Sequence, residues 1–383
     1  MKRTLAIIVT LCLVVFCFVF SISSKDEEGK IKLRFNPSYR GDTITKQKTG
    51  LLWALSFLGA ELPKNSFEKG LTQIEGHRYE LNIDQLGFNE KAVKALNRIF
   101  LELKASEEYK TMGGIDLGGF IVYTVGSSWH YYEITGAEKT FVQYKNKFGN
   151  DHSIVFPVLN SSVAKHHRMI RMNDGGDAAK MSFIAEEGHG DIDKGSFKGV
   201  THEVYDIMKN GQLRFAIYGA DGELKDASEP EFSVAGKPVK CLWCHEINII
   251  PLLNKNTQVK SYIDPNEFQE KIKEKINTLE LYREKLNSDI DFKNKQDHTL
   301  MELLYISYMQ PSIFRLAHEW NQPEKRLESQ FEKIGKTNHY EFPFLSNLLA
   351  RNIVNAHSPY ATVLLPDSVR EHNNSEPNVF RQQ

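Results

Sequence analysis

Two thiols and one imidazole lie side by side in the chain, in the run Cys241-Leu242-Trp243-Cys244-His245. Cysteines two residues apart can each add across one vinyl group of a porphyrin, and a histidine directly after them can bind the iron through a ring nitrogen. The spacing therefore predicts one covalently bound haem c per chain. Cys241 and Cys244 would form the thioethers and His245 would be the proximal iron ligand, while the sixth ligand and any catalytic residue stay unassigned.

Two other chemistries use the same cysteine spacing. A thiol-redox or disulfide pair also has two intervening residues, but such a site usually opens a long helix, and Pro251 follows this motif closely. A zinc site needs four ligands, and no second cysteine pair accompanies this one, so scattered histidines would have to complete it. Both alternatives remain open beside haem, which the spacing favours.

The first residues have the pattern of an export signal. Lys2 and Arg3 precede an apolar run from Leu5 to Phe20, and small residues follow up to Ser23. This pattern is typical of a cleaved secretory signal or of an uncleaved anchor, and in both cases the rest of the chain is exported. We therefore expect a bacterial protein of the periplasm or of the outer face of the cell membrane, with an N-terminal membrane anchor if the run is not removed.

The use of cysteine supports the same cofactor. Of the four cysteines, Cys12 and Cys17 lie within the N-terminal apolar run. If that run is removed, Cys241 and Cys244 are the only thiols of the mature protein. Because haem is attached covalently on the exported side of the bacterial membrane, the signal and the motif favour haem together.

The composition indicates a globular protein and gives little information about partners. The chain has 383 residues, of which 41% are hydrophobic and 25% are charged, enough for two or three domains. Its net charge of -1 gives no reason to expect nucleic acid as a partner. The partner expected from the motif is a redox protein or a small-molecule ligand, and the oligomeric state is not predicted.

The element pattern predicts an α+β fold with three parts after the signal. Residues 1–23 are the signal peptide or anchor, 24–112 a helical N-terminal region, 113–260 a β-rich haem domain and 261–383 a helical C-terminal region. Residues 25–45 are polar and indicate a linker. Helices are expected over 51–62 and 88–103, the second capped by Asn89. The β-branched and aromatic runs at 120–125, 140–144 and 154–159 indicate strands.

The clearest local prediction is a hairpin. Two strand-like runs, 201–208 and 213–218, flank Asn210-Gly211, the preferred pair for a type I′ turn because both central residues need positive φ. After the motif, Asp264-Pro265 predicts a helix start. Further helices are expected over 300–320, with a kink near Pro311, and over 322–334 and 344–354, before a loose tail after residue 367.

Several side chains could complete or surround the iron site. Candidate sixth ligands are two downstream methionines and five upstream histidines: Met301, Met309, His130, His166, His167, His189 and His202. Methionine on an apolar helix usually fills core space, and a single histidine is more often a surface or hydrogen-bonded residue. Among them His202 is slightly better placed, because Val200 and Val204 share its strand face.

Two charged clusters have both a functional and an ordinary interpretation. Lys165-His166-His167-Arg168 with Arg171 could face haem propionates through charge-assisted hydrogen bonds, although a solvated surface is the commoner role. Glu186-Glu187 with Asp191 and Asp193 invites a calcium interpretation. The hand-type calcium loop does not fit, because Gly195 and His202 stand where ligands are required, so an acidic loop is expected.

By Cys241, Cys244 and His245 the chain resembles the monohaem c-type cytochromes. A β-rich segment ahead of the motif, from His202 to Tyr218 and then Gly219-Ala220-Asp221-Gly222, is similar to the cytochromes c-prime-beta and their hydroxylamine-oxidising relatives. This resemblance implies an antiparallel sheet lining the haem. The oxidising members also link a lysine to the porphyrin, and none of Lys165, Lys180 and Lys194 has a distinctive context for that role. The helical part after residue 260 departs from the pattern.

Three functions follow as hypotheses. The first is an electron-transfer cytochrome of the cell envelope. The second is a haem enzyme or gas-binding protein whose iron keeps an open position for a small nitrogen or oxygen species. The third is an exported binding protein without haem, in which Cys241 and Cys244 form a disulfide.

Overall fold

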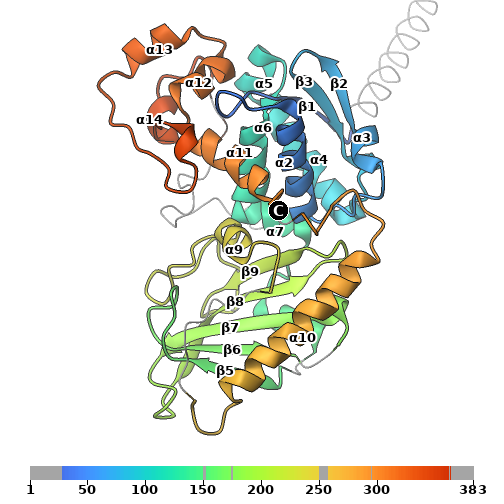
Figure 1. The fold of residues 1–383 in the computed structure, drawn as a ribbon, viewed down its shortest axis with the longest axis vertical. Coiled ribbons are helices and arrows are strands. Elements are labelled where there is room, and N and C mark those ends of the chain that lie inside the picture. The colour runs from blue at the N-terminus through green and yellow to red at the C-terminus, as the bar shows by residue number, and fades with distance from the viewer. Residues whose placement is uncertain are drawn as a thin grey trace, which may run out of the picture.

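The computed structural model describes residues 28–149, 152–173, 176–249, 258–294, 296–361 and 363. The N-terminal apolar run and the tail after residue 367 lie outside these ranges. A five-stranded sheet forms one end of the molecule, and helices with a small second sheet form the other (Figure 1). The chain therefore has the predicted α+β fold, with two mostly antiparallel sheets.

The helical half is built from segments before and after the large sheet. Its sheet has the order β2-β3-β1-β4. The helix α11 packs against α2 and α6, so residues near 300 share a core with the N-terminal segment. The bounds of its strands are β1 Lys30–Arg34, β2 Leu71–Glu75, β3 Arg78–Asn82 and β4 Ile115–Asp116. The helices are α2 Ile44–Phe57, α3 Ser66–Gly70, α4 Glu90–Ala105, α5 Glu107–Met112, α6 Leu117–Ile121, α7 Ser128–Thr135, α11 Thr299–Met309, α12 Ile313–Trp320, α13 Glu324–Gln330 and α14 Arg351–Asn355. The helix α8 Phe141–Phe148 follows α7 and packs on the large sheet.

Two predicted strands in this half are wrong. Residues 120–125 form the end of α6 and the π-helical turn Val122–Gly126, and residues 141–144 begin α8. Asp116 starts α6 by accepting hydrogen bonds from the backbone of Gly118 and Gly119, and a reciprocal capping box starts α8. The predicted linker at 25–45 is also wrong, since it contains β1 and the start of α2. Local β propensity is overridden here by packing and by helix caps.

The large sheet is an antiparallel meander in sequence order. Its strands are β5 Ile154–Val158, β6 Arg168–Met172, β7 Ser182–His189, β8 Lys198–Ile207 and β9 Leu213–Tyr218. The helices α9 Pro238–His245 and α10 Pro265–Glu284 cover one face, and α10 crosses that face in Figure 1. On the other face the ring of Phe141 from α8 stacks on the ring of His202, with 3.8 Å between centroids.

The predicted hairpin between β8 and β9 is confirmed, but its turn differs. Only Gly211 has positive φ, at 80°, and the Met208 amide donates to the Gln212 carbonyl at 2.8 Å. This is a three-residue loop with glycine in the left-handed region. The Asn210 side chain donates to the carbonyls of Ser56 and Ala60 at 2.7 and 2.8 Å. The hairpin tip is thereby fixed to the end of α2.

The C-terminal helices largely follow the prediction. Asp264 accepts from the Asn266 amide at 2.8 Å and starts α10. The segment around Pro311 separates α11 from α12, and Ser312 caps the second helix. A buried ion network joins this segment to the N-terminal strands: Arg34 with Glu108, Arg315 with Asp116, and Arg351 with Glu319. None of the helices within the described ranges is both long and apolar enough to cross a membrane.

Candidate cofactor site

The predicted cofactor motif forms the last turns of α9. Pro238 occupies the first turn, and the helix ends at His245, after which Glu246 and Ile247 adopt φ values of 44° and 66°. The Asn248 amide donates to the His245 carbonyl at 2.7 Å. Residues three and four apart lie on the same helix face, so both cysteines and the histidine are directed to one side of α9.

That side of α9 opens into an apolar cavity between the helix, the large sheet and α10. The space inside it, including the part that is open to solvent, is about 960 Å³. Cys241, Cys244 and His245 all line it. The other lining side chains are mostly apolar or aromatic: Ile170, Phe183, Ala185, Tyr205, Phe215, Ile217, Phe268 and Ile272.

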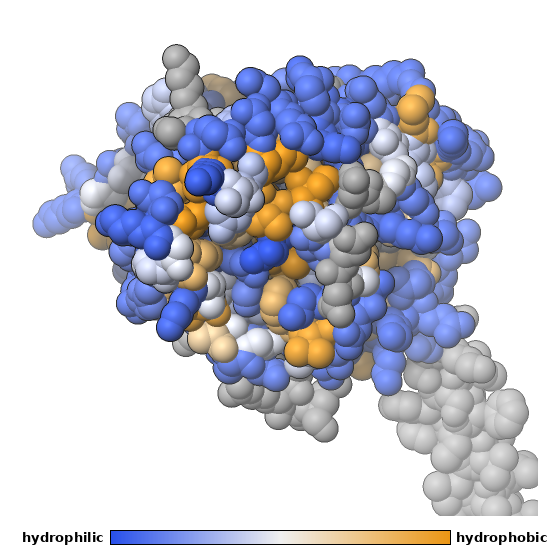
Figure 2. Space-filling view, turned by 90° about the horizontal axis from the view of Figure 1, so that it is seen from below, coloured by the Kyte–Doolittle hydropathy of each residue, from blue (hydrophilic) through white to orange (hydrophobic). Residues whose placement is uncertain are grey.

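The end of the molecule that contains the large sheet has an apolar area on its surface. Apolar residues gather there within a rim of hydrophilic ones (Figure 2). An apolar area with a polar rim is typical of a ligand groove or of a contact surface.

The imidazole of His245 lies against two aromatic side chains of the cavity. Its ring lies 5.1 Å from that of Tyr205 and 5.2 Å from that of Phe215, measured between centroids. Within the described part of the chain its Nδ1 is buried without a hydrogen-bond partner. Burial lowers the pKa of His245 to about 4, more than a backbone hydrogen bond with Asn248 raises it. The imidazole is therefore neutral at pH 7, which is the form that binds a metal.

The environment of the thiols weighs against a redox dithiol. Cys241 is half-buried, and its Sγ lies 3.8 Å from the Lys237 carbonyl oxygen. Burial raises the pKa of Cys241 well above its usual value, whereas reactive cysteines have a lowered pKa and often lie at a helix N-terminus. Here the motif lies at the C-terminal end of α9. Cys244 is exposed.

A charged triad lies where the cavity meets β6, β7 and β8. Arg168 donates from Nε to Glu187 Oε1 at 2.9 Å and from Nη2 to Glu203 Oε2 at 2.5 Å. Ser233 also donates to Glu203. Arg168 and Glu203 line the cavity. Of the predicted basic cluster only Arg168 does so, because side chains alternate along β6 and Arg171 pairs with Glu186.

Among the described residues none of the proposed sixth ligands lines the cavity. His202 lies on the opposite face of the sheet, against Phe141. Met301 and Met309 are buried in the core of the helical half. His130 interacts through Nδ1 with the Tyr123 carbonyl at 2.7 Å, and the His166 ring lies 6.3 Å from that of His189. His202 lies on β8, a strand that borders the cavity, but its side chain points away from the cavity.

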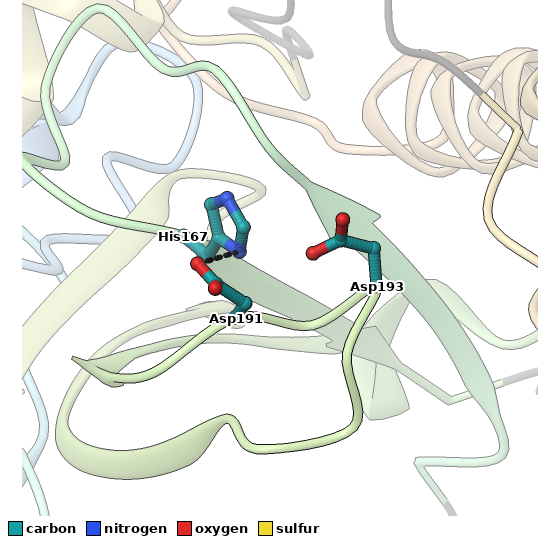
Figure 3. A group of neighbouring side chains, drawn as sticks. All are labelled: His167, Asp191 and Asp193. Atoms are coloured by element: carbon teal, nitrogen blue, oxygen red, sulfur yellow. Dashed lines mark ion pairs between the residues drawn. The ribbon is translucent and has the colours of Figure 1, made fainter.

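The acidic loop comes close to a histidine that sequence reasoning had placed in another cluster. His167, Asp191 and Asp193 have side-chain atoms near enough to share a cation (Figure 3). Their ligand atoms are partly engaged already, because the Ile192 amide donates to His167 Nδ1 at 3.0 Å and Lys194 pairs with Asp191. The group therefore carries no argument for a metal.

The sequence analysis did not predict which residues form the cavity walls, although the alternation of side chains along the predicted hairpin indicated some of them. Tyr205 and Phe215 face each other in the register of β8 and β9, and alternation from the predicted hairpin would have placed them on one face. The predicted packing residues Phe268 and Ile272 of α10 also line the cavity. Lys165, Lys180 and Lys194, none of which was assigned a role, do not line it, whereas Lys240 does.

Comparison of the chain with family models, with curated proteins and with solved structures returned no match.

Proposed function

We propose that the chain is an exported c-type haem protein that binds a small ligand at its iron. The observation that carries this proposal is that Cys241, Cys244 and the neutral imidazole of His245 all line one apolar cavity. This is the set of side chains that covalent haem attachment requires.

The residues of the cavity fit a haem group. Cys241 and Cys244 would hold its vinyl edge, and His245 would bind the iron in its neutral form. The apolar and aromatic walls would exclude water from the porphyrin faces. Haem bound there would supply a ligand-binding or one-electron redox centre. The five-stranded antiparallel sheet that lines the cavity supports the resemblance to the cytochromes c-prime-beta.

The cavity favours an open sixth position over a closed one. Apart from His245, its described lining includes no histidine and no methionine. The segment 250–257, which connects α9 to α10, contains neither residue in its sequence. An iron without a second protein ligand is free to bind a diatomic gas or another small nitrogen or oxygen species.

The test is the absorption spectrum of the chain expressed with a haem-attachment machinery. The proposal expects a protein that stays coloured after denaturation and acid-acetone extraction, because the haem is covalent. The ferrous spectrum should change on addition of carbon monoxide. A colourless product overturns the haem assignment, and a coloured product that does not respond to carbon monoxide overturns the open position.

Electron transfer with a redox partner protein is a second candidate function. It is favoured by the exposure of Cys244, since a porphyrin edge attached there would lie near the surface. A closed, six-coordinate spectrum together with rapid reduction by a small cytochrome would support this role over ligand binding.

A further inference from the structure

The charged triad at the cavity has one more acid than it has bases. Arg168 reaches both Glu187 and Glu203, so one guanidinium serves two carboxylates. The side chains of Arg168, Glu187 and Glu203 are only 11%, 2% and 14% exposed. A buried cluster with uncompensated negative charge is costly, and two close carboxylates normally respond by sharing a proton.

One oxygen of the triad is left without a donor. Glu187 accepts two hydrogen bonds from Arg168 at Oε1, and its Oε2 is buried without a partner among the described residues. Charged and titratable groups reach this cluster from each element around it. Arg168 comes from β6, Glu203 from β8, and Lys240 and Cys241 come from α9, while Ser233 approaches from the loop before α9.

The same cluster lies within electrostatic reach of the proposed haem. Glu203 lines the cavity beside Cys241, and its charge and that of Arg168 both act on the Cys241 thiol. A porphyrin held at Cys241 would therefore feel the charge of the triad. Oxidation of iron from ferrous to ferric adds one positive charge to that porphyrin.

We propose that Glu187, Arg168 and Glu203 form a proton-binding site that releases its proton when the haem iron is oxidised. This inference rests on the proposed function. When an external oxidant removed one electron from haem held there, one carboxylic acid of the pair would release one proton to solvent, so that the net charge in the cavity would stay the same. Reduction reverses both steps. Burial and the neighbouring Glu203 raise the pKa of Glu187 to about 8, which agrees with a proton held at neutral pH.

The test is a spectroelectrochemical titration of the full, haem-loaded chain over pH values on both sides of 8. Because the ferric state favours the ionised pair, the midpoint potential should fall as pH rises. Each tenfold change in proton concentration should shift it by up to about 59 mV for a one-electron couple. Infrared difference spectra should show the loss of a protonated carboxyl band on oxidation.

Glu187→Gln should remove the slope and the infrared band, and Glu203→Gln serves as a second variant if the first does not fold. Glu186→Gln is the matched control, because Glu186 is the adjacent residue of β7 and pairs with Arg171 instead. A potential that is independent of pH in the haem-containing wild type, or a slope that persists in both triad variants, overturns the inference alone. A chain that takes up no haem overturns the proposed function and this inference together.

Discussion

The indole of Trp243 packs edge-on against the ring of Tyr305, with 4.8 Å between centroids and 67° between planes. Trp243 lies between the two cysteines of the motif, and Tyr305 belongs to α11 of the helical half. Gly126 lies directly against Tyr305, where an added Cβ would be 2.5 Å from a ring carbon. This contact fixes α9 to the helical half, independently of any bound group.

Loss of the Trp243 ring should destabilise the whole molecule. Trp243→Ala removes a buried aromatic side chain and should lower the free energy of unfolding by about 3–5 kcal/mol, measured by urea denaturation without haem. Tyr340→Ala is the control, because Tyr340 is 95% exposed, and it should change the value by less than about 0.5 kcal/mol. Equal effects of the two substitutions would show that the contact is not an anchor.

The motif residues should have separable effects on haem. Cys244→Ala should leave a single thioether and a shifted haemochrome band, whereas full attachment in this variant would contradict the assignment. His245→Gly should keep covalent haem but lose its axial ligand, and added imidazole should restore the wild-type spectrum. His189→Gly is the matched control, because the His189 side chain is 60% exposed, and its spectrum should be unchanged with or without imidazole.

Acid should destabilise the folded chain through His202. Its pKa is lowered to about 4, chiefly by burial, and is about 6.5 in an unfolded chain. Between these values the unfolded state binds more protons, so stability falls as pH drops from 6.5 toward 4. His202→Phe keeps the stacking on Phe141 and should reduce this loss in urea titrations at a series of pH values. An unchanged loss of stability in the His202→Phe variant would contradict this role of His202.

The buried pair of Arg315 and Asp116 should be far more sensitive than a surface pair. Its side chains are 2% and 0% exposed. Asp116→Ala leaves a buried guanidinium with a poor partner and should cost about 3–5 kcal/mol of unfolding free energy. Glu75→Ala breaks the exposed pair with Arg78 and should cost at most about 1 kcal/mol. A loss below 1 kcal/mol for Asp116→Ala would contradict a structural role for the network.

Glycine at position 246 should stabilise the chain. Glu246 is exposed and has a φ of 44°, a conformation that costs a residue with a side chain roughly 1–2 kcal/mol. Glu246→Gly should therefore raise the unfolding free energy by about 0.5–1 kcal/mol. Glu267→Gly, in the first turn of α10, is the control and should lower it by a similar amount. A loss of stability in both variants would show that position 246 is not strained.

Local signals predicted the elements that depend on local chemistry. Asn89 and Asp264 both cap helices as expected, and the hairpin after residue 200 has its predicted strands. Residues 120–125 could not be predicted, because the glycines on either side of them, Gly118, Gly119 and Gly126, let Tyr305 and Tyr308 approach closely and fix a helical path. The strand β1 was not predicted, because it is formed by pairing with β3 and β4, which lie far along the sequence.

The candidate site was predictable only at its motif. The spacing of the five residues from Cys241 predicts a haem site, which stays a prediction, but the walls of the cavity depend on the register of the sheet. The triad shows this most clearly, because Arg168 meets Glu187 and Glu203 only once β6, β7 and β8 are aligned. No pattern within a single strand contains that information.

The two residues after His245, which have positive φ, connect the end of α9 to α10. Ile247 is β-branched and buried, a residue type that rarely adopts a φ of 66°. Its carbonyl oxygen accepts a hydrogen bond from Arg283 of α10 at 2.6 Å, and Arg283 also holds the Gly211 carbonyl at the hairpin tip. Arg283 thus holds the turn at Glu246 and Ile247 in its unfavourable backbone conformation. A displacement of α10 would break this hydrogen bond and free the turn that follows His245, so a molecule that shifts α10 would move the His245 ring from outside the cavity.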